Sequence, residues 1–600
     1  MNRLRRIIQV SVVLQMLTLT NVMDAQTLES RRQKLAELIA QQWEYTLTTN
    51  PELASLLGDK RFNDRLSDFS EEVVHKDLQQ TQSFLMQFEA INTAGFPDQE
   101  KLNKELMIRS LKEKLDNARF KLWEMPVDQF SGIHVRLVQL VSQLQFQNAK
   151  DYDDYVARVR QVPRALEQNI ILMRKGMADK LMPPKFLLEQ AAAQADRLAS
   201  LTPEESPFGQ SLRSMPSSIP PAEQTRIRND VLAAIRDSVL PSYVKFGKFV
   251  RDEYAPHGRT EPGVWSLPDG QARYAALAKQ YTTTNLTPDE IHELGLAQVA
   301  AIEAKMLAFA TQQGYKDLKS FHNALQTNPK FHPHSREELL DLYRKYIDQM
   351  YPRLPELFIR LPKAKLEVLA VESFREQEAP AAQYLSGSPD GSRPGRVEVN
   401  TGDFEHRSTL PVEAVAYHEG VPGHHMQISI SQELPTLPPF RQQATFSYSA
   451  YSEGWGLYAE ALGKDVGFYK DPYSYYGYLQ NEMLRAIRLV VDTGLHYKKW
   501  SRQQVVDFFH AHSAIDETDV QNETNRYIAI PGQALSYKVG QLKLIELREY
   551  AKSALGKDFD IREFHDQILG AGALPLDILE TRIKQWVTAE QMKQRSAVAK

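Results

Sequence analysis

The proline–glycine pair Pro422-Gly423 is the feature that most limits how this chain can fold around its histidines. It interrupts a stretch that reads Tyr417-His-Glu-Gly-Val-Pro-Gly-His-His-Met-Gln427. A proline at this position cannot donate a backbone hydrogen bond to residue 418, and its ring crowds the carbonyl group of that residue. We therefore expect one helix to end and another to begin here.

This break decides which histidines lie close together. Two histidines four residues apart on one helical face, with a glutamate after the first, are typical of zinc peptidases. If Pro422-Gly423 is an inserted bulge, removing it restores that pattern with His418 and His424. In a regular helix, His425 would instead share the face of His418. We favour His424, because proline followed by glycine indicates a bulge.

A second stretch, Ser452-Glu-Gly-Trp-Gly-Leu-Tyr-Ala-Glu460, supplies a carboxylate. Glu453 lies in an apolar segment, where an isolated inward carboxylate is costly unless it is paired or binds a metal. Two imidazoles, one carboxylate and an open fourth position make a catalytic zinc site. We therefore predict one Zn²⁺ per chain, held by His418, His424 and Glu453. Glu419 would then act as general base on the attacking water.

Two further stretches complete a family resemblance: Arg488-Leu-Val-Val-Asp-Thr-Gly-Leu-His496 and Arg526-Tyr-Ile-Ala-Ile-Pro-Gly-Gln-Ala-Leu-Ser-Tyr-Lys538. With the two histidine and glutamate stretches, they resemble the bacterial domain-of-unknown-function family 885. That family is similar to the gluzincin metallopeptidases, in which a glutamate is the third zinc ligand. The resemblance implies a mostly helical, peptidase-like fold. Gly456 stands where we expect alanine, a change that should leave the ligands untouched.

The last of these stretches contains candidates for contact with a substrate. The phenol of Tyr527 could donate a hydrogen bond to a tetrahedral oxyanion. Arg526 or Lys538 could pair with a peptide carboxylate. Aromatic packing and helix-capping charges are the alternative interpretation. The candidate substrate contacts are Arg526, Lys538, Tyr537 and, at the end of an expected strand, Asn400.

Three more residues are expected to support the ligands: His425, Glu460 and Asp492. Asp492 belongs to a set that lies on one helical face, namely Arg485, Arg488, Asp492 and His496. Such a face is usually solvated and rich in salt bridges. The resembled family places this element beside the active site, which implies that Asp492 orients a ligand histidine.

The remaining sequence indicates a large helical protein. Apolar spacing predicts helices over residues 71–88 and 99–115, two helices between residues 151 and 198, and one long helix over residues 222–254. Thr287 and Ser501 are expected N-caps. Residues 366–371 and 395–400 are the best strand candidates; they form either a sheet edge that holds substrate or an ordinary hairpin. We predict a mainly α, two-lobed, metallopeptidase-like fold with a small β-sheet beside the zinc helix. The helical lobe would span residues 26–375 and the zinc-binding catalytic lobe residues 376–600, with both lobes belonging to one family unit.

The N-terminus predicts export. Residues 1–6 are basic, residues 7–22 are mostly apolar and Met23-Asp-Ala25 is an acceptable cleavage site, so residues 1–25 are interpreted as a signal peptide. An uncleaved anchor is the alternative. The sequence has no cysteine, which excludes thiolate ligands, cysteine nucleophiles and lipid attachment at an N-terminal cysteine. We expect a periplasmic or secreted protein without a membrane association after cleavage.

The expected activity is hydrolysis of short peptides, with cleavage from the C-terminal side as one form of it. A formal net charge of −4 argues against nucleic acid as a partner. Two other classes remain open on sequence alone. One is a metal-dependent hydrolase of a non-peptide amide, and the other is a non-catalytic helical binding protein.

Overall fold

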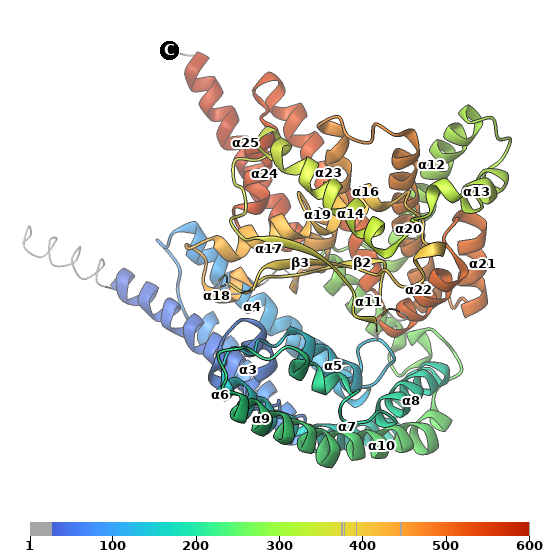
Figure 1. Ribbon diagram of the computed structural model, residues 1–600. Helices are drawn as coiled ribbons and strands as arrows, with labels where there is room; N and C mark the ends of the chain where they lie inside the picture. The colour runs from blue at the N-terminus through green and yellow to red at the C-terminus, as the bar shows by residue number, and fades with distance from the viewer. Residues whose placement is uncertain are drawn as a thin grey trace, which may run out of the picture.

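The protein is mainly helical, and its described part contains a small three-stranded sheet near the middle of the molecule (Figure 1). The computed structural model describes residues 27–373, 376, 379–389, 391, 393–443 and 447–598. The predicted mainly α fold is confirmed. The expected signal peptide, residues 1–25, lies outside the described residues.

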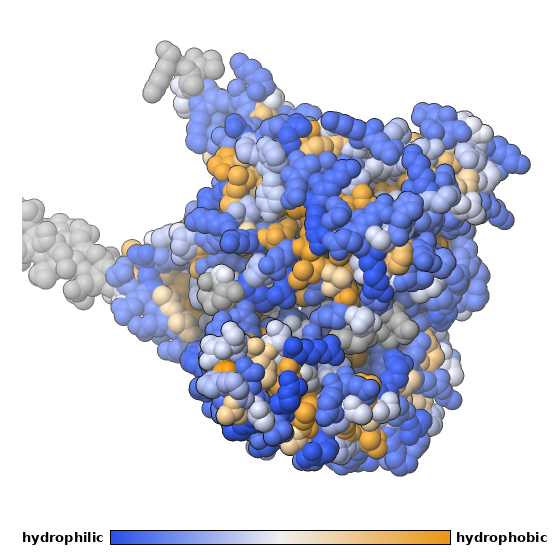
Figure 2. All heavy atoms as spheres, in the orientation of Figure 1, coloured by the Kyte–Doolittle hydropathy of each residue, from blue (hydrophilic) through white to orange (hydrophobic). Residues whose placement is uncertain are grey.

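The N-terminal helices form an arc along one side of the molecule, coloured blue to green at the bottom of Figure 1. One buried cluster in this arc includes Phe84, Phe88 and Leu111, and a larger one includes Tyr155 and Tyr243. On the face drawn in Figure 2, a hollow separates the arc from the upper part of the molecule. The helices are residues 27–49, α2 (Pro51–Leu56), α3 (Glu71–Glu89), α4 (Asp98–Ala118), α5 (Ile133–Gln143), α6 (Ala149–Val159), α7 (Val162–Ala178), α8 (Lys185–Ala199), α9 (Pro221–Ala234) and α10 (Leu240–Phe249).

Helix boundaries in the arc follow its prolines. Between residues 151 and 198 the chain forms parts of three helices rather than the expected two. Pro163 lies in the first turn of α7, where proline is favoured, so a new helix begins directly after α6. The long helix expected over residues 222–254 is present: a π-helical turn at Ile235–Val239 connects α9 to α10, and a second one, Val250–Tyr254, follows α10.

The helices from α11 onward share one core with the C-terminal half. This core includes Val264, Tyr343 and Met350 together with Tyr417 and Trp455. The expected division between residues 375 and 376 therefore runs through a continuous cluster. The helices before the sheet are α11 (Gly270–Thr282), α12 (Pro288–Gln312), α13 (Leu318–Gln326), α14 (Arg336–Met350) and α15 (Leu354–Leu357).

The C-terminal half packs two of its helices at very short distance. A Cβ atom on Gly540 would lie 1.9 Å from the carbonyl oxygen of Ala450 and 2.7 Å from the Cα atom of Gly454, so glycine is needed at the crossing of α19 and α23. The helices are α16 (Val412–Glu419), α17 (His424–Glu433), α18 (Pro439–Gln442), α19 (Ser449–Asp465), α20 (Pro472–His496), α21 (Arg502–His512), α22 (Glu517–Ala529), α23 (Ser536–Leu555), α24 (Ile561–Leu569) and α25 (Leu576–Val598).

Helix α12 packs along α20. The Thr287 side chain accepts a hydrogen bond from the Glu290 amide, and the Glu290 side chain accepts one from the Thr287 amide, so this N-cap is confirmed. Ser501 caps α21 in the same way, with Gln504. Among the described helices, α12 alone is long and apolar enough by length and composition to cross a membrane. Its buried face belongs to the main core, as is usual for a core helix of a globular protein.

The sheet contains both expected strands and one that the sequence pattern did not indicate. Strand β3 (Gly395–Val399) pairs in parallel with β1 (Leu366–Ala370) and antiparallel with β2 (Ala382–Leu385), in the order β1-β3-β2. Only Tyr384 is buried in β2, so this four-residue strand shows too little alternation to be recognised. The Tyr384 hydroxyl lies 3.2 Å from Nδ1 of His425 in α17, which places the sheet beside the histidine stretch as predicted.

Candidate metal centre

The helix break at Pro422-Gly423 is present in the structure. Helix α16 ends at Glu419 and α17 begins at His424. The indole Nε1 of Trp455 donates a 2.9 Å hydrogen bond to the Pro422 carbonyl, which fixes the connecting turn against α19. A Cβ atom on Gly423 would lie 1.9 Å from the carbonyl oxygen of His418, so only glycine fits there. The bulge brings the first residue of α17 back towards the last turn of α16.

His418, His424 and Glu453 come together at this bulge. One potential ligand atom from each residue lies within 4.8 Å of the other two. Oε2 of Glu453 is 3.6 Å from Nε2 of His418 and 3.3 Å from Nε2 of His424. Ligand atoms about 2.0–2.2 Å from one tetrahedral zinc ion lie roughly 3.3–3.6 Å apart. The spacing and the donor set therefore fit a zinc ion with little rearrangement.

Glu460 holds the ring of His418. Its carboxylate is fully buried and accepts a 2.9 Å hydrogen bond from Nδ1 of His418, which leaves Nε2 directed at Glu453. This carboxylate–histidine contact is the usual way in which a metal-binding imidazole is oriented. The other side of the ring touches Gly456, where a Cβ atom would lie 2.6 Å from both Nε2 and Cε1 of His418. The expectation that position 456 does not touch the ligands is therefore wrong, because Gly456 lies against the ring of His418.

The centre carries an excess of negative charge. Glu419, Glu453 and Glu460 surround the two imidazoles, with the guanidinium of Arg485 4.0 Å from Glu460. Burial raises the pKa of Glu419, whereas hydrogen bonds to the histidines outweigh burial and hold the pKa of Glu453 well below its usual range. A divalent cation would balance these carboxylates.

His425 is directed away from this group. Its Nδ1 faces the hydroxyl groups of Tyr384 at 3.2 Å and Ser429 at 3.5 Å, and burial lowers the pKa of the imidazole to about 4. The regular-helix alternative, in which His425 shares the face of His418, therefore does not describe this chain. His425 contributes to packing between α17 and the sheet.

The polar face of α20 is buried rather than solvated. Asp492 accepts hydrogen bonds from the Tyr274 hydroxyl at 2.6 Å and from the Gly532 amide, so it anchors other segments instead of orienting a ligand histidine. Burial raises the pKa of Asp492 to about 7. His496, also fully buried, donates from Nε2 to the Tyr527 carbonyl.

Two of the predicted substrate residues are engaged elsewhere. The hydroxyl of Tyr527 donates to Glu523 and accepts from Arg488, and the side chain is only 1% exposed. Lys538 is 2% exposed and binds Glu482 at 2.5 Å in a buried ion pair. Neither group faces open space, so their expected roles as oxyanion donor and carboxylate partner are not supported by the structure.

The other predicted substrate contacts are Asn400, Arg526 and Tyr537. The Asn400 side chain is fully buried, donates to two loop carbonyls and accepts from the Gly402 amide, so it stabilises the loop after β3 rather than binding substrate. Arg526 is partly exposed and donates a 3.1 Å hydrogen bond to the hydroxyl of Tyr537. Arg526 therefore keeps some accessible surface, whereas Tyr537 is 8% exposed and buried beside it.

The sequence did not assign roles to Arg485, which lies 4.0 Å from Glu460, or to Arg488, which binds Glu523. Their positions on one face of α20 were visible in the pattern, but only the packing of α22 shows that the face is buried.

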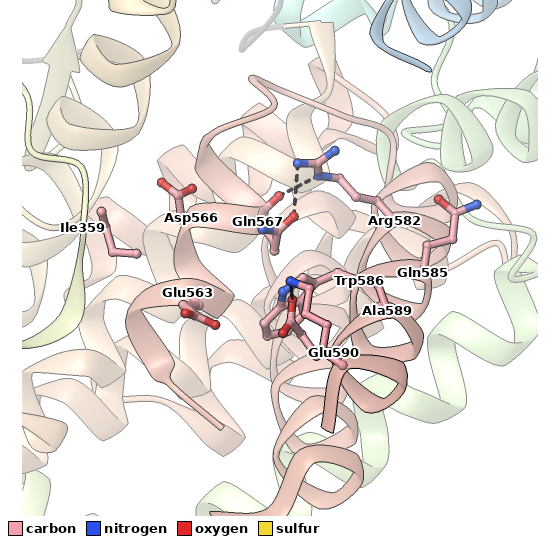
Figure 3. A pocket seen from close by; sticks show the side chains of 10 residues that line it. Ile359, Glu563, Asp566, Gln567, Arg582, Gln585, Trp586, Ala589 and Glu590 are labelled. Carbon is pink, nitrogen blue, oxygen red and sulfur yellow. Dashed lines mark hydrogen bonds and ion pairs between the residues drawn. The ribbon is translucent and has the colours of Figure 1, made fainter. Parts of the chain in front are cut away.

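A separate surface pocket of about 640 Å³ lies between α24 and α25 and includes Ile359, Asp566 and Arg582 (Figure 3). None of the candidate residues lines that pocket.

Comparisons with known proteins place the chain in a family. The model of the family described as "Bacterial protein of unknown function (DUF885)" matches residues 51–583. The chain belongs to this family. No curated protein matches it. This DUF885 member is similar to a crystal structure described as a "putative lipoprotein" from Colwellia psychrerythraea, with 29% identity and a TM-score of 0.88 over 93% of this chain and all of that one.

A second solved structure shares the fold. It is described as a "putative lipoprotein of unknown function" from Shewanella oneidensis, and it is 16% identical, with a TM-score of 0.68 over 91% of this chain and 99% of that one. At this identity the likeness extends to the fold alone. The DUF885 architecture described above is therefore also found in experimentally determined structures.

Proposed function

We propose that this DUF885 protein is an exported zinc-dependent peptidase that hydrolyses short peptides. The observation that carries the proposal is the arrangement of His418, His424 and Glu453, with ligand-atom spacings of 3.3 and 3.6 Å and with Glu460 hydrogen-bonded to His418. The adjacent carboxylate of Glu419 supplies the group that hydrolysis needs and that a purely structural metal site does not require.

Each residue of the site has a separate part in the proposed hydrolysis. Zinc, when bound, would polarise the scissile carbonyl and lower the pKa of a water molecule. Glu419 takes a proton from the attacking water, whose oxygen adds to the carbonyl carbon, and then gives that proton to the amide nitrogen as the C–N bond breaks. The products are a carboxylate and an amine. Glu460 keeps Nδ1 of His418 protonated, so the lone pair on Nε2 stays available as a ligand.

Export is part of the proposal. It is supported by the basic and apolar segments at the N-terminus, which match a secretory signal. It is also supported by the similar structure from Colwellia psychrerythraea, which is described as a "putative lipoprotein". We propose a periplasmic or secreted location, where short peptides are available as substrates.

Glu419→Gln tests the proposed base. The substitution keeps the shape of the side chain but removes proton acceptance, so zinc content should be retained and turnover of short peptides should fall at least about a hundredfold. Zinc is measured by elemental analysis and turnover on a panel of short peptides. Glu189→Gln, at an exposed position of α8, is the matched control and should behave as wild type.

Near-normal turnover by zinc-loaded Glu419→Gln would remove Glu419 from this role. If wild-type protein were inactive on every peptide but hydrolysed small non-peptide amides, the chain would be an amide hydrolase of another class. Absence of any hydrolysis by zinc-loaded protein would favour a binding protein.

A further inference from the structure

Arg488 of α20 and Arg526 of α22 share a single carboxylate. Arg488 donates from Nη2 to Glu523 at 2.8 Å, and Arg526 donates from Nη1 to the other oxygen of Glu523 at 3.2 Å. Arg488 is 5% exposed, and the positive charges of the two guanidinium groups are close enough to repel each other. Two cations against one anion leave an excess positive charge in a buried place.

The same arginines have hydrogen-bond donors that remain unused. Within the described part of the chain, Nη1 of Arg488 and Nε of Arg526 are buried and have no hydrogen-bond partner. A buried charged donor without an acceptor is unfavourable, and such groups are usually satisfied by a ligand, ion or water. Tyr537 lies between them: its ring is 4.4 Å from the guanidinium carbon of Arg488, and its hydroxyl accepts from Arg526 at 3.1 Å.

Two helices connect this cluster to residues that touch the metal centre. On α20, Arg488 follows Arg485 by one turn, and Arg485 approaches Glu460, the partner of His418. On α23, Tyr537 precedes Gly540 by one turn, and Gly540 touches Gly454, the neighbour of the ligand Glu453. One turn of helix rises about 5.4 Å, and one extended residue spans about 3.3–3.6 Å. A short peptide bound at the metal could therefore extend to this cluster.

The N-terminal arc reaches this cluster. The ring of Phe130, which is 41% exposed, lies 5.9 Å from the guanidinium carbon of Arg526. The neighbouring Gln129 side chain donates a 3.4 Å hydrogen bond to the Asn525 carbonyl. The loop between η2 (Leu122–Glu124) and α5 therefore covers the end of the cluster. A substrate that extended past Arg526 would meet this loop.

We infer that Arg488, Arg526 and Tyr537 form a subsite for the C-terminal carboxylate of a peptide, so that the enzyme removes short C-terminal fragments. This inference rests on the proposed peptidase function. Planar guanidinium groups with free N–H donors match the geometry of a carboxylate. The phenol of Tyr537 accepts hydrogen bonds from Arg526 and Gln533, which leaves its own proton for the substrate. Arg488 would therefore pair with the peptide carboxylate, the role that the sequence alone suggested for Lys538.

Hydrolysis of matched peptides provides the first test. One short peptide is compared as the free acid and as its C-terminal amide, and wild-type protein should favour the acid roughly ten- to 150-fold in kcat/KM, the factor expected for one charge-assisted hydrogen bond. Arg526→Met should lower this ratio towards one. Arg236→Met, at a position whose side chain is 62% exposed, makes the same charge change on the surface and should leave the ratio unchanged.

Binding to a protein that cannot turn over separates this inference from the peptidase proposal. Glu419→Gln protein is titrated calorimetrically with the free acid, with its amide, and with an amidated peptide that ends in glutamate. The acid should bind more tightly than either amide, and adding Arg526→Met should abolish the difference while circular dichroism shows an intact fold.

The possible outcomes differ for the two proposals. Preferential binding of the acid without hydrolysis by wild-type protein would keep the subsite and overturn the peptidase. Hydrolysis of acid and amide at equal rates would keep the peptidase and overturn the subsite. Equal binding of the acid and the glutamate amide would show that any carboxylate is accepted and would overturn the assignment to the C-terminus.

Discussion

The position of the His418 ring depends on two residues of α19. Glu460 accepts its Nδ1–H, and Gly456 leaves room for the ring face. Both residues lie in the stretch that the sequence singled out, yet only Glu460 was expected to support the ligand. A glycine in a helix suggests weak helix propensity, and nothing in the local sequence indicates that an imidazole from another helix occupies the space.

Gly456→Ala should lower metal affinity. The added methyl group would lie 2.6 Å from the His418 ring, so the ring must shift. This shift should weaken its hydrogen bond to Glu460 and move Nε2 away from the position of the metal. Loss of an outer contact to a metal ligand typically costs ten- to a hundredfold in affinity. We expect at least about a tenfold loss, measured by competition with a chelator.

Gly295→Ala is the control for this substitution. Its Cβ atom would lie 2.8 Å from side chains of α20, away from the ligand group, so stability should fall while metal affinity stays at the wild-type value. Equal metal affinity in Gly456→Ala and wild type would show that the ring tolerates the methyl group and that the proposed fit is wrong.

Helix α20 carries the polar contacts that connect the metal centre to the rest of the molecule. Arg485 approaches Glu460, Arg488 binds Glu523 of α22, and Asp492 binds Tyr274 of α11. The sequence correctly indicated that these side chains share one face. Their environment depends on which helices cover that face, and the usual solvated interpretation was therefore wrong.

Asp492→Asn should change how stability depends on pH. Burial raises the pKa of Asp492 from 3.8 to about 7 in the folded protein. Because the folded pKa exceeds the unfolded one, the stabilisation from the protonated group is complete below about pH 4 and is lost as the pH rises through 7. The difference corresponds to roughly 4 kcal/mol. Asparagine keeps an oxygen for Tyr274 and Gly532 but does not ionise.

The expected result is that the Tm of Asp492→Asn relative to wild type is higher at pH 8 than at pH 5, measured by thermal unfolding at both values. Asp98→Asn, at a position whose side chain is 99% exposed, is the control and should show no such change. A Tm difference for Asp492→Asn that is the same at both pH values would contradict the buried, protonated state.

At the scale of the whole molecule, local patterns predicted elements better than their arrangement. The break at Pro422, the caps at Thr287 and Ser501, and strands β1 and β3 follow from local backbone chemistry and were predicted. The division at residues 375/376 cuts the main core because α12 packs on α20, a contact between distant segments that no local pattern reveals. Lys538 was misassigned for the same reason, since its partner Glu482 comes from another helix.

The central claim is that His418, His424 and Glu453 hold one zinc ion, and elemental analysis of purified protein tests it most directly. Wild-type protein prepared without added metal should contain about one zinc per chain. His424→Ala should lose most of this metal, because its Nε2 lies 3.3 Å from Glu453. His425→Ala should retain it, because that ring faces Tyr384. Wild-type protein that neither contains a tightly bound divalent metal nor gains activity on reconstitution, or a reversed result for the two histidines, would contradict the account.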